Sequence, residues 1–440
     1  MPEPVLPATA RTLLARVARA QADGRAPSLV AGVVRDGGLA WSAGRGAVAE
    51  PHADVQYRLG SISKTVTAVL VMRLRDEGRL ALDDPLERHL PGTPLGERTV
   101  GQLLSHLAGA SAESPGGWWE RVPGGSLADL ALSDDDVVLG AARRFHYSNL
   151  GFGLLGELVA RQRGTSWEDA VRTEVLSPLG MSRTTPRPSG AAAQGQAVHP
   201  WADVVLPEPE HHAGVMAAAG QLWATLTDLG RFAAFLLGDT ADVLDPATLE
   251  EMTEPAGVDS SALGWSAYGL GLQVLRVDGR TLVGHGGSMP GFLAGVFVDR
   301  DERTGAVSLA NATAGVDPVV FGLLADLRAA EPRIVEAWSP SPSPVPLESL
   351  GVWFWGVSPV ALRAVAGGRL HLGPLPGRGG RASRFEQRDG RWVGLDGYYA
   401  GETLSIAEDH LDLGTFIFTR TPYDPAAPVP GGVDEAGWRG

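Results

Sequence analysis

The spacing of apolar residues near the start of the chain predicts strands followed by a long helix. Apolar positions run through 30–34 and resume at 39–41, on either side of Asp36-Gly37, a pair typical of a tight hairpin turn. From Ser61 to Glu77 the apolar positions recur with helical spacing, and the segment ends at Gly78. We therefore expect an antiparallel hairpin that leads into a helix.

Helical and strand-like patterns also occur in blocks elsewhere along the chain. Residues 8–22 have the pattern of an amphipathic helix, and much of 95–255 is predicted to be helical with loops, including 227–237. Strands return later, at 269–277, 281–284, 292–298 and 306–309. The pattern indicates an α+β fold: an antiparallel sheet, built from both ends of the domain, is flanked by helices and interrupted by a helical insert.

A proline/serine segment separates this domain from the end of the chain. Residues 337–346 read Ala-Trp-Ser-Pro-Ser-Pro-Ser-Pro-Val-Pro, a composition typical of an extended linker. Short aromatic strands separated by turns follow it, for example around Trp353, Trp392 and 415–418. We predict a first domain over 1–336, a linker over 337–346 and a small all-β barrel over 347–440.

Composition narrows the classes of function. The net charge of −14 argues against nucleic acid or an anionic membrane as a partner. There is no cysteine, so disulfides and thiolate chemistry are excluded, and no sequence feature indicates a cofactor. The first residues, Met1 to Pro7, contain Glu3 and several prolines where a secretory signal needs a basic segment and an apolar run. We expect a cytoplasmic protein.

The lysine count points to one position. Of the 37 basic residues only Lys64 is a lysine, and it lies three residues after a serine in Gly60-Ser61-Ile62-Ser63-Lys64. A GC-rich genome explains the scarcity of lysine but not the place where one was kept. Arginine stays protonated in proteins, whereas a buried lysine amine can lose its proton near neutral pH. At position 64 the chain therefore keeps an amine that can act as a base.

The spacing of Ser61 and Lys64 suits nucleophilic catalysis. If Ser61 opens the helix, Lys64 lies one turn later on the same face, within reach of the serine oxygen. The free N–H groups and positive dipole at the start of a helix can also stabilise an oxyanion.

Two further segments carry groups of the right kind. Tyr147-Ser148-Asn149 supplies a phenol that can pass a proton and a carboxamide that can hold a substrate amide. His285-Gly286-Gly287-Ser288 follows a predicted strand, where glycines admit substrate to the strand edge and a histidine pKa can cross neutrality. Each segment taken alone also fits an ordinary loop.

Together the three segments resemble the motifs of the serine β-lactamase and penicillin-binding-protein superfamily, and most closely its class C β-lactamase-like branch. That branch includes esterases, D-aminopeptidases, DD-peptidases and peptide-cyclising thioesterases, and the resemblance covers roughly residues 10–330. It implies Ser61 as nucleophile, Lys64 as base and Tyr147 as proton donor to the leaving group. The remaining implied roles are substrate binding by Asn149, His285, Gly286 and Gly287, and an oxyanion hole from the backbone N–H groups of Ser61 and Ser288.

Two departures and the tail refine what the resemblance implies. Class C β-lactamases have lysine at the third motif, where this chain has His285. They are also exported, whereas no export signal is predicted for this chain. Both departures favour esterase, peptidase or acyl-transfer work over antibiotic resistance. The C-terminal strands resemble the lipocalin-like barrel that some members carry. It could bind a small apolar ligand or be filled by its own side chains, and we favour a role in shaping the substrate site.

Three functions remain open at this stage. The first is a hydrolase of ester or amide substrates, including D-amino-acid-containing peptides. The second is a penicillin-binding-protein-type thioesterase or acyltransferase, whose substrate would arrive on an acyl-carrier protein. The third is a non-catalytic sensor. The expected partner is a small-molecule or peptide acyl substrate, with no nucleic acid and no membrane.

Other conspicuous residues are assigned structural roles. His211 and His212 are adjacent, so their side chains diverge, and no metal site is predicted. His106 is expected to be a structural hydrogen bonder. Trp118-Trp119 could line the acyl pocket or cover the core, and both interpretations stay open.

Overall fold

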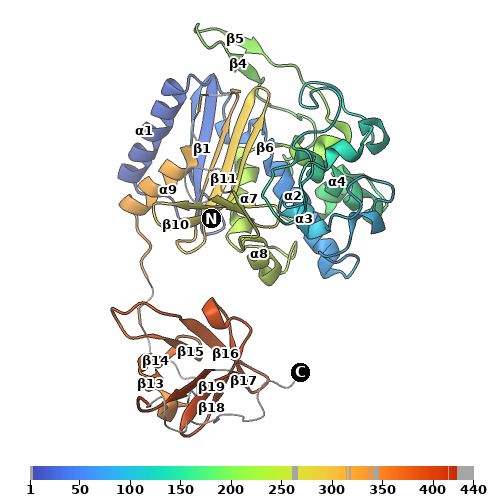
Figure 1. The fold of residues 1–440 in the computed structure, drawn as a ribbon. Coiled ribbons are helices and arrows are strands. Elements are labelled where there is room, and N and C mark those ends of the chain that lie inside the picture. Colours follow the sequence, from blue (N-terminus) through green and yellow to red (C-terminus); the bar gives the residue numbers. More distant parts are fainter. Residues whose placement is uncertain are drawn as a thin grey trace. The chain divides into compact units, whose positions relative to one another are not determined.

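Strands from both ends of the first 330 residues form one antiparallel sheet in the computed structural model. The order is β2-β1-β12-β11-β10-β9-β8-β7, and Figure 1 shows blue and yellow-orange strands side by side. The bounds are β1 Ser28–Arg35, β2 Gly38–Gly46, β7 Gly257–Asp259, β8 Ser266–Tyr268, β9 Gln273–Val277, β10 Arg280–Met289, β11 Phe292–Asp299 and β12 Thr304–Ala310. This arrangement confirms the predicted α+β class.

The structure describes residues 3–259, 266–313, 315–316, 319–335, 337–338, 340, 346–414 and 416–423. Contacts divide the chain into two compact units, Met1–Arg333 and Ile334–Gly440. The predicted boundaries at 336 and 346 stay a prediction, because 336, 339 and 341–345 lie outside the described residues. Among the described residues, no helix combines the length and apolar character that a membrane crossing requires.

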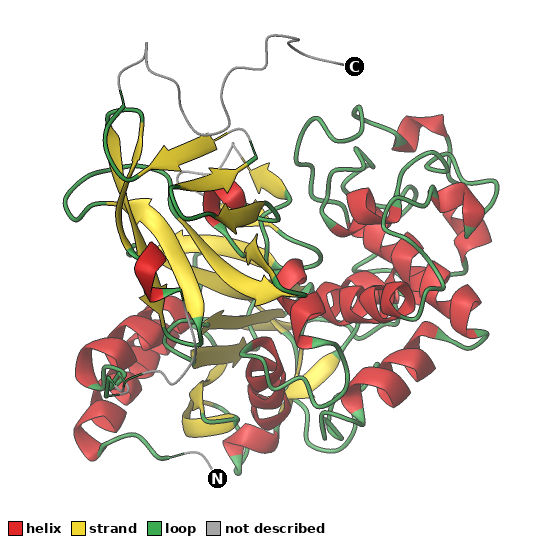
Figure 2. Ribbon diagram, turned by 90° about the horizontal axis from the view of Figure 1, so that it is seen from below, coloured by secondary structure: helices red, strands yellow, loops and turns green. Residues whose placement is uncertain are grey.

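Helices cover both faces of the sheet because successive residues of each strand point to opposite sides. One face packs against α7, and the other packs against α1 and α9. In Figure 2 most of the other helices gather beyond one edge of the strands. The helices are α1 Pro7–Asp23, α2 Ile62–Asp76, α3 Val100–Leu104, α4 Asn149–Arg163, α5 Trp167–Val171, α6 Ala217–Gly220, α7 Leu226–Leu236, α8 Pro246–Met252 and α9 Val319–Ala330.

The predicted helix from 61 to 77 is α2, and its ends follow from its sequence. Arg73 and Arg75 lie in the last turn, where their charge complements the helix dipole. Gly78 has a φ of +70° and terminates the helix. The middle of the helix is buried on all sides, so α2 is a central element of the core rather than a surface helix.

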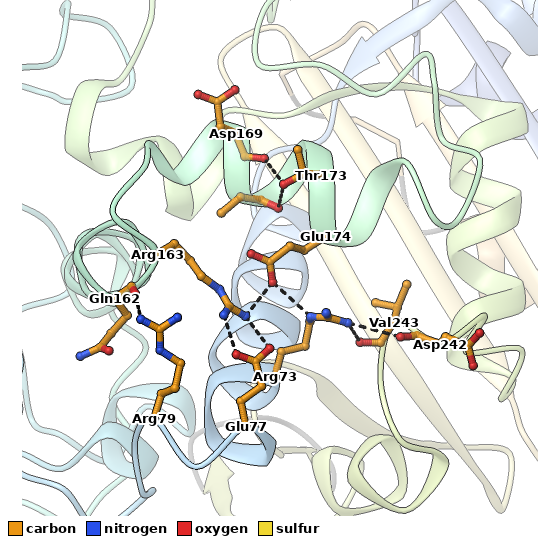
Figure 3. Close-up of polar contacts among 11 residues, drawn as sticks. Arg73, Glu77, Arg79, Gln162, Arg163, Asp169, Thr173, Glu174, Asp242 and Val243 are labelled. Carbon is orange, nitrogen blue, oxygen red and sulfur yellow. Dashed lines mark hydrogen bonds and ion pairs between the residues drawn. The ribbon is translucent and has the colours of Figure 1, made fainter.

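An arginine–glutamate network joins the far end of α2 to α4 (Figure 3). Glu174, in the π-helical turn Arg172–Leu176, accepts from Arg73 at 3.2 Å and from Arg163 at 2.7 Å. Arg163 also pairs with Glu77 at 2.5 Å. The network therefore links the last turns of the two helices whose first turns carry candidate site residues.

The third motif differs from expectation in its place on the sheet. The predicted strand 281–284 continues to Met289, so His285 to Ser288 lie within β10 and pair with β11. Only the first half of β10 pairs with β9. The predicted strand 269–277 is shorter, because a turn closed by Gly269 N–H to the Leu272 carbonyl occupies its start.

Two small pairs of strands complete the first unit. β3 Gln56–Arg58, which lies just before α2 in the chain, pairs with β6 Trp223–Thr225. β4 Gln196–Val198 pairs with β5 Val205–Pro207. The first pair fixes the segment from which Ser61 emerges.

The second unit is a closed barrel of eight antiparallel strands. Its strands are β13 Gly351–Trp355, β14 Ser358–Val365, β15 Arg369–Pro374, β16 Ser383–Arg388, β17 Arg391–Gly394, β18 Thr403–Ile406, β19 His410–Leu413 and β20 Phe416–Thr419. Residue 415 of the predicted last strand lies outside the described residues. Trp353, Phe385 and Phe418 belong to one buried apolar cluster, which favours a barrel filled by its own side chains.

Candidate active site

Ser61 lies at the tight turn from β3 into α2. Gly60 before it has a φ of +55°, which glycine adopts without strain. A Cβ atom on Gly60 would lie 2.5 Å from the backbone nitrogen of Ser288, and one on Gly287 would lie 1.8 Å from the carbonyl oxygen of Leu59. Two glycines thus let the turn at Ser61 and the free edge of β10 pack backbone against backbone.

Lys64 lies one helical turn after Ser61 and points back to it. Its Nζ donates to Ser61 Oγ at 2.9 Å and to the carbonyl oxygen of Ala219, in α6, at 2.8 Å. Lys64 is fully buried. Burial lowers the pKa of Lys64 from 10.5 to about 7, with Glu113 acting in the opposite direction. Near neutral pH a substantial fraction of the amine is therefore unprotonated and can accept the proton of Ser61.

Tyr147 completes a compact group with these two residues. Lys64 Nζ lies 5.0 Å from the centroid of the Tyr147 ring. Burial raises the pKa of Tyr147 above its ordinary value, while a hydrogen bond with Ser61 acts against that rise. The phenol therefore keeps its proton at neutral pH and contacts the Ser61 side chain directly.

Asn149, the first residue of α4, has a partner that sequence patterns did not indicate. Its Nδ2 donates to both carboxylate oxygens of Glu113, each at 2.9 Å. Glu113 also accepts from Trp119 Nε1 at 2.6 Å. Glu113 lies in a loop with no periodicity, so no local signal separates it from other loop carboxylates.

The same contact settles the open question on the paired tryptophans. Trp119 is 5% exposed, belongs to the main core and anchors Glu113. Trp118 is exposed and lies over the guanidinium of Arg121 at 4.6 Å. Trp119 therefore covers the core, and neither tryptophan borders the cavity described below.

His285 differs from expectation in its protonation. Its Nδ1 lies 2.5 Å from the carbonyl oxygen of Gly286, so Nδ1 carries the hydrogen and Nε2 accepts from Tyr268 Oη at 2.9 Å. Burial lowers the pKa of His285 to about 3. The prediction that the pKa of this histidine lies near neutrality was therefore wrong. Residue 285 borders the cavity, and its role in holding substrate stays a prediction.

An aromatic cluster supports Tyr147 from behind. The ring of His106 lies 4.2 Å from that of Tyr147 and 4.4 Å from that of Tyr268, measured between centroids. His106 Nδ1 accepts from the backbone N–H of Ser148 at 3.0 Å, which agrees with its predicted structural role. Tyr268 was not predicted as part of the site.

A cavity of about 430 Å³ borders Ser61. The predicted site residues Ser61, Tyr147, His285, Gly286, Gly287 and Ser288 border it. Lys64 lies behind Ser61, and Asn149 is bonded to Glu113. The fold thus brings the three predicted motifs together. The roles of Asn149, Gly286 and Gly287 in substrate binding, and of the Ser61 and Ser288 N–H groups as an oxyanion hole, stay predictions.

The adjacent histidines have separate partners, as their adjacency predicts. His212 Nε2 lies 2.5 Å from Glu168, and His211 Nε2 lies 3.2 Å from the carbonyl oxygen of Trp119. The two rings therefore contact different segments, helix α5 for His212 and the loop at Trp119 for His211.

Comparison with known proteins agrees with this geometry. The β-lactamase family model matches residues 13–331, and a domain of unknown function, DUF7586, matches 342–420. Curated relatives include Beta-lactamase-like protein 2 of Dictyostelium discoideum, at 28% identity over 46% of this chain and 39% of that protein. Penicillin-binding protein 4 of Amycolatopsis lactamdurans is 26% identical over 69% of this chain and 85% of its own length. The chain thus spans well under half of the Dictyostelium protein.

Solved structures extend the likeness to the fold. The octameric penicillin-binding protein homologue from Pyrococcus abyssi aligns with a TM-score of 0.65 at 21% identity, over 93% of this chain and 99% of that one. A D-stereospecific amidohydrolase from a Streptomyces species has a TM-score of 0.60 at 26% identity, over 73% and 98%. SurE has a TM-score of 0.59 at 25% identity, over 94% and 99%. With three motifs converging on one serine and a family match across the first unit, the chain belongs to the β-lactamase family.

Proposed function

We propose that this chain is a serine hydrolase that cleaves ester or amide substrates, including D-amino-acid-containing peptides, through an acyl-enzyme on Ser61. One observation carries the proposal: a fully buried amine with a pKa of about 7 lies 2.9 Å from Ser61 Oγ. An amine with that pKa is balanced between accepting and releasing a proton at neutral pH, as a general base requires. The similarity to a D-stereospecific amidohydrolase supports the choice of substrate class.

The proposed reaction has two steps, acylation of Ser61 and hydrolysis of the acyl-enzyme. In the first, neutral Lys64 takes the proton of Ser61 as Oγ attacks the carbonyl carbon, and the bond to the leaving group then breaks. Tyr147 donates a proton to the departing oxygen or nitrogen and is reprotonated from Lys64. In the second, water attacks the acyl carbon and gives a proton to Lys64. The bond to Ser61 Oγ then breaks and Lys64 passes that proton to Oγ, which releases the acid and restores Ser61. The N–H groups of Ser61 and Ser288 stabilise the oxyanion, each by about 3–4 kcal/mol.

A labelling experiment tests the proposal directly. A fluorophosphonate should form a stoichiometric adduct on Ser61, identified by peptide mass spectrometry, and Lys64→Arg should lose this labelling because arginine cannot accept the proton. Turnover of p-nitrophenyl acetate, nitrocefin and D-alanine p-nitroanilide, compared side by side, would rank ester, β-lactam and amide substrates. A folded protein in which Ser61 stays unlabelled would overturn the proposal and favour the non-catalytic sensor.

A second candidate is an acyltransferase or peptide-cyclising thioesterase, supplied by an acyl-carrier protein. It is favoured by the closed C-terminal barrel, which resembles the lipocalin-like domain of stand-alone thioesterases in this superfamily. The amidohydrolase aligns over 73% of this chain, whereas SurE aligns over 94% and so includes both units. The two candidates share the acyl-enzyme and differ in what attacks it. Product analysis with a peptidyl thioester separates them: hydrolysis gives a linear acid, and transfer or cyclisation gives an amide.

A further inference from the structure

A row of small residues crosses the sheet on the face that packs against α9. Gly286, Gly295 and Ser308 lie opposite one another on the adjacent strands β10, β11 and β12. Directly opposed residues of antiparallel strands project to the same face. Along this row the sheet therefore carries no side chain larger than serine. Helix α9 packs close to it, because a Cβ atom on Gly295 would lie 3.4 Å from Val320 Cγ1; α9 runs beside the strands in Figure 1.

The cavity in front of Ser61 extends along this row. Besides Ser61 and Tyr147, its lining includes the apolar residues Leu293, Phe297 and Phe321. Phe321 belongs to α9, and its ring lies 4.8 Å from that of Phe297 between centroids. The cavity thus leads from the nucleophile into an apolar space between the sheet and α9.

The backbone does not require glycine at position 286. A Cβ atom there would meet only Gln273 Oε1, at 3.9 Å, and the φ angle lies outside the left-handed region. Gly60 and Gly287 differ, because a Cβ atom on either would collide with backbone. What glycine at 286 preserves is the open volume in front of it.

The lining of this cavity carries no formal charge at neutral pH. It contains no aspartate, glutamate, lysine or arginine among the described residues. Its titratable groups are Tyr147, whose pKa is raised by burial, and His285, whose pKa is lowered to about 3. A charged substituent placed here would lose its hydration without a partner, whereas a hydrocarbon chain would gain from leaving water.

We infer that this cavity binds an aliphatic chain of the substrate, next to the carbonyl that Ser61 attacks, so that the preferred ester, thioester or amide substrates carry a hydrocarbon chain. The inference rests on the proposed function and names its substrate class. The chain can belong to the acyl group or to the alcohol or thiol. Each methylene that enters the cavity should raise kcat/KM about three- to fourfold until the space is filled.

Two ester series test the inference and identify the side of the carbonyl. One series is p-nitrophenyl acetate to decanoate, and the other is the acetates of ethanol to 1-decanol. A rise of kcat/KM with length in either series supports the cavity and assigns the chain to that side. A flat response in both would overturn it.

Three variants connect chain length to this cavity. Ser308→Leu places a larger side chain in the cavity. In the series that responds to chain length, it should lower the ratio of kcat/KM for the longest ester to kcat/KM for the shortest at least tenfold. Phe321→Ala enlarges it and should move the optimum to longer chains. Leu324→Ala, the matched control, removes a buried apolar side chain of α9 that is outside the cavity lining and should leave the ratio unchanged. A ratio that stays constant in both cavity variants, with folding verified by circular dichroism, would contradict the inference.

Failure of the inference can be separated from failure of the proposed function. Ethyl and decyl fluorophosphonates report on both: no label on Ser61 from either contradicts the proposed function, and equal labelling rates contradict the cavity alone. Calorimetry on Ser61→Ala needs no catalysis. The variant should bind 1-decanol at least tenfold more tightly than 1-butanol, and adding Ser308→Leu should remove the difference. Equal affinities for the two alcohols would overturn the cavity whatever the labelling shows.

Discussion

The side-chain amide of Asn149 donates to both carboxylate oxygens of Glu113, each at 2.9 Å. This contact joins the start of α4 to the loop between the first two motifs. It also places a negative charge close enough to raise the pKa of Lys64, against the larger effect of burial. Glu113 therefore adjusts the protonation of the proposed base without touching it.

Replacement of Glu113 should shift the pH dependence of the reaction. Activity requires neutral Lys64, so kcat/KM should rise with pH through about 7. Glu113 and Glu120 both favour protonated Lys64, and Glu113 has the larger effect. In Glu113→Gln that larger effect is gone, the pKa of Lys64 falls, and the acidic limb of the pH profile should move to lower pH. Glu97→Gln, at an exposed position, is the control and should not move it. An unchanged limb in Glu113→Gln would refute this coupling.

Removal of the Tyr147 hydroxyl should affect poor leaving groups most. An amine leaving group needs a proton as it departs, and p-nitrophenolate does not. Tyr147→Phe should therefore lower kcat/KM for an amide by about 10²–10⁴-fold and for p-nitrophenyl acetate far less. Steady-state kinetics on both substrates measure the difference. Equal losses on both substrates would show that Tyr147 does not act as the proton donor.

Lys64→Met should stabilise the protein while abolishing activity, and the gain should depend on pH. The folded-state pKa of Lys64, about 7, lies below its ordinary value of 10.5, so the unfolded state binds the extra proton between these values. The buried lysine is thus most destabilising below pH 7, and the penalty, on the order of a few kcal/mol, falls as pH rises from 7 to 10.5.

Urea unfolding of both proteins between pH 6 and 10.5 measures this effect. The stability advantage of Lys64→Met should be largest at pH 6 and should shrink across the interval. An advantage that stays constant with pH would mean that Lys64 keeps its proton in the folded state. That result would refute the proposal that Lys64 acts as the base.

Substitution of Gly60 should disable the site through backbone contact. Gly60→Ala adds the strain of a positive φ, about 1–2 kcal/mol, and a Cβ atom 2.5 Å from Ser288 N. Gly78→Ala is a matched control, because its φ is +70° and nothing lies within 4 Å of the added atom. Both variants should lower Tm, but only Gly60→Ala should lose kcat/KM by tenfold or more. Similar kinetics in the two would show that the β10 edge tolerates displacement.

Local patterns along the chain were enough to predict most of the fold. The hairpin at Asp36-Gly37, the helix ending at Gly78 and the strands 292–298 and 306–309 are found as expected, because turn residues and apolar spacing are local signals. The predicted end of one strand, at residue 284, was wrong, because β10 continues to Met289. Glycines 284, 286 and 287 weaken the strand signal there, and only pairing with β11 extends β10 to Met289.

Sequence patterns were enough to propose which groups form the site: a lone lysine three residues after a serine, a tyrosine and a glycine-rich segment, together resembling one family's motifs. The protonation and the partners of those groups depend on how the chain folds. The pKa of Lys64 and the neutrality of His285 come from burial, and Glu113, Tyr268 and Ala219 reach the site from segments without a periodic signal. Desolvation and long-range contact depend on which distant segments pack together, and a linear pattern does not contain that information.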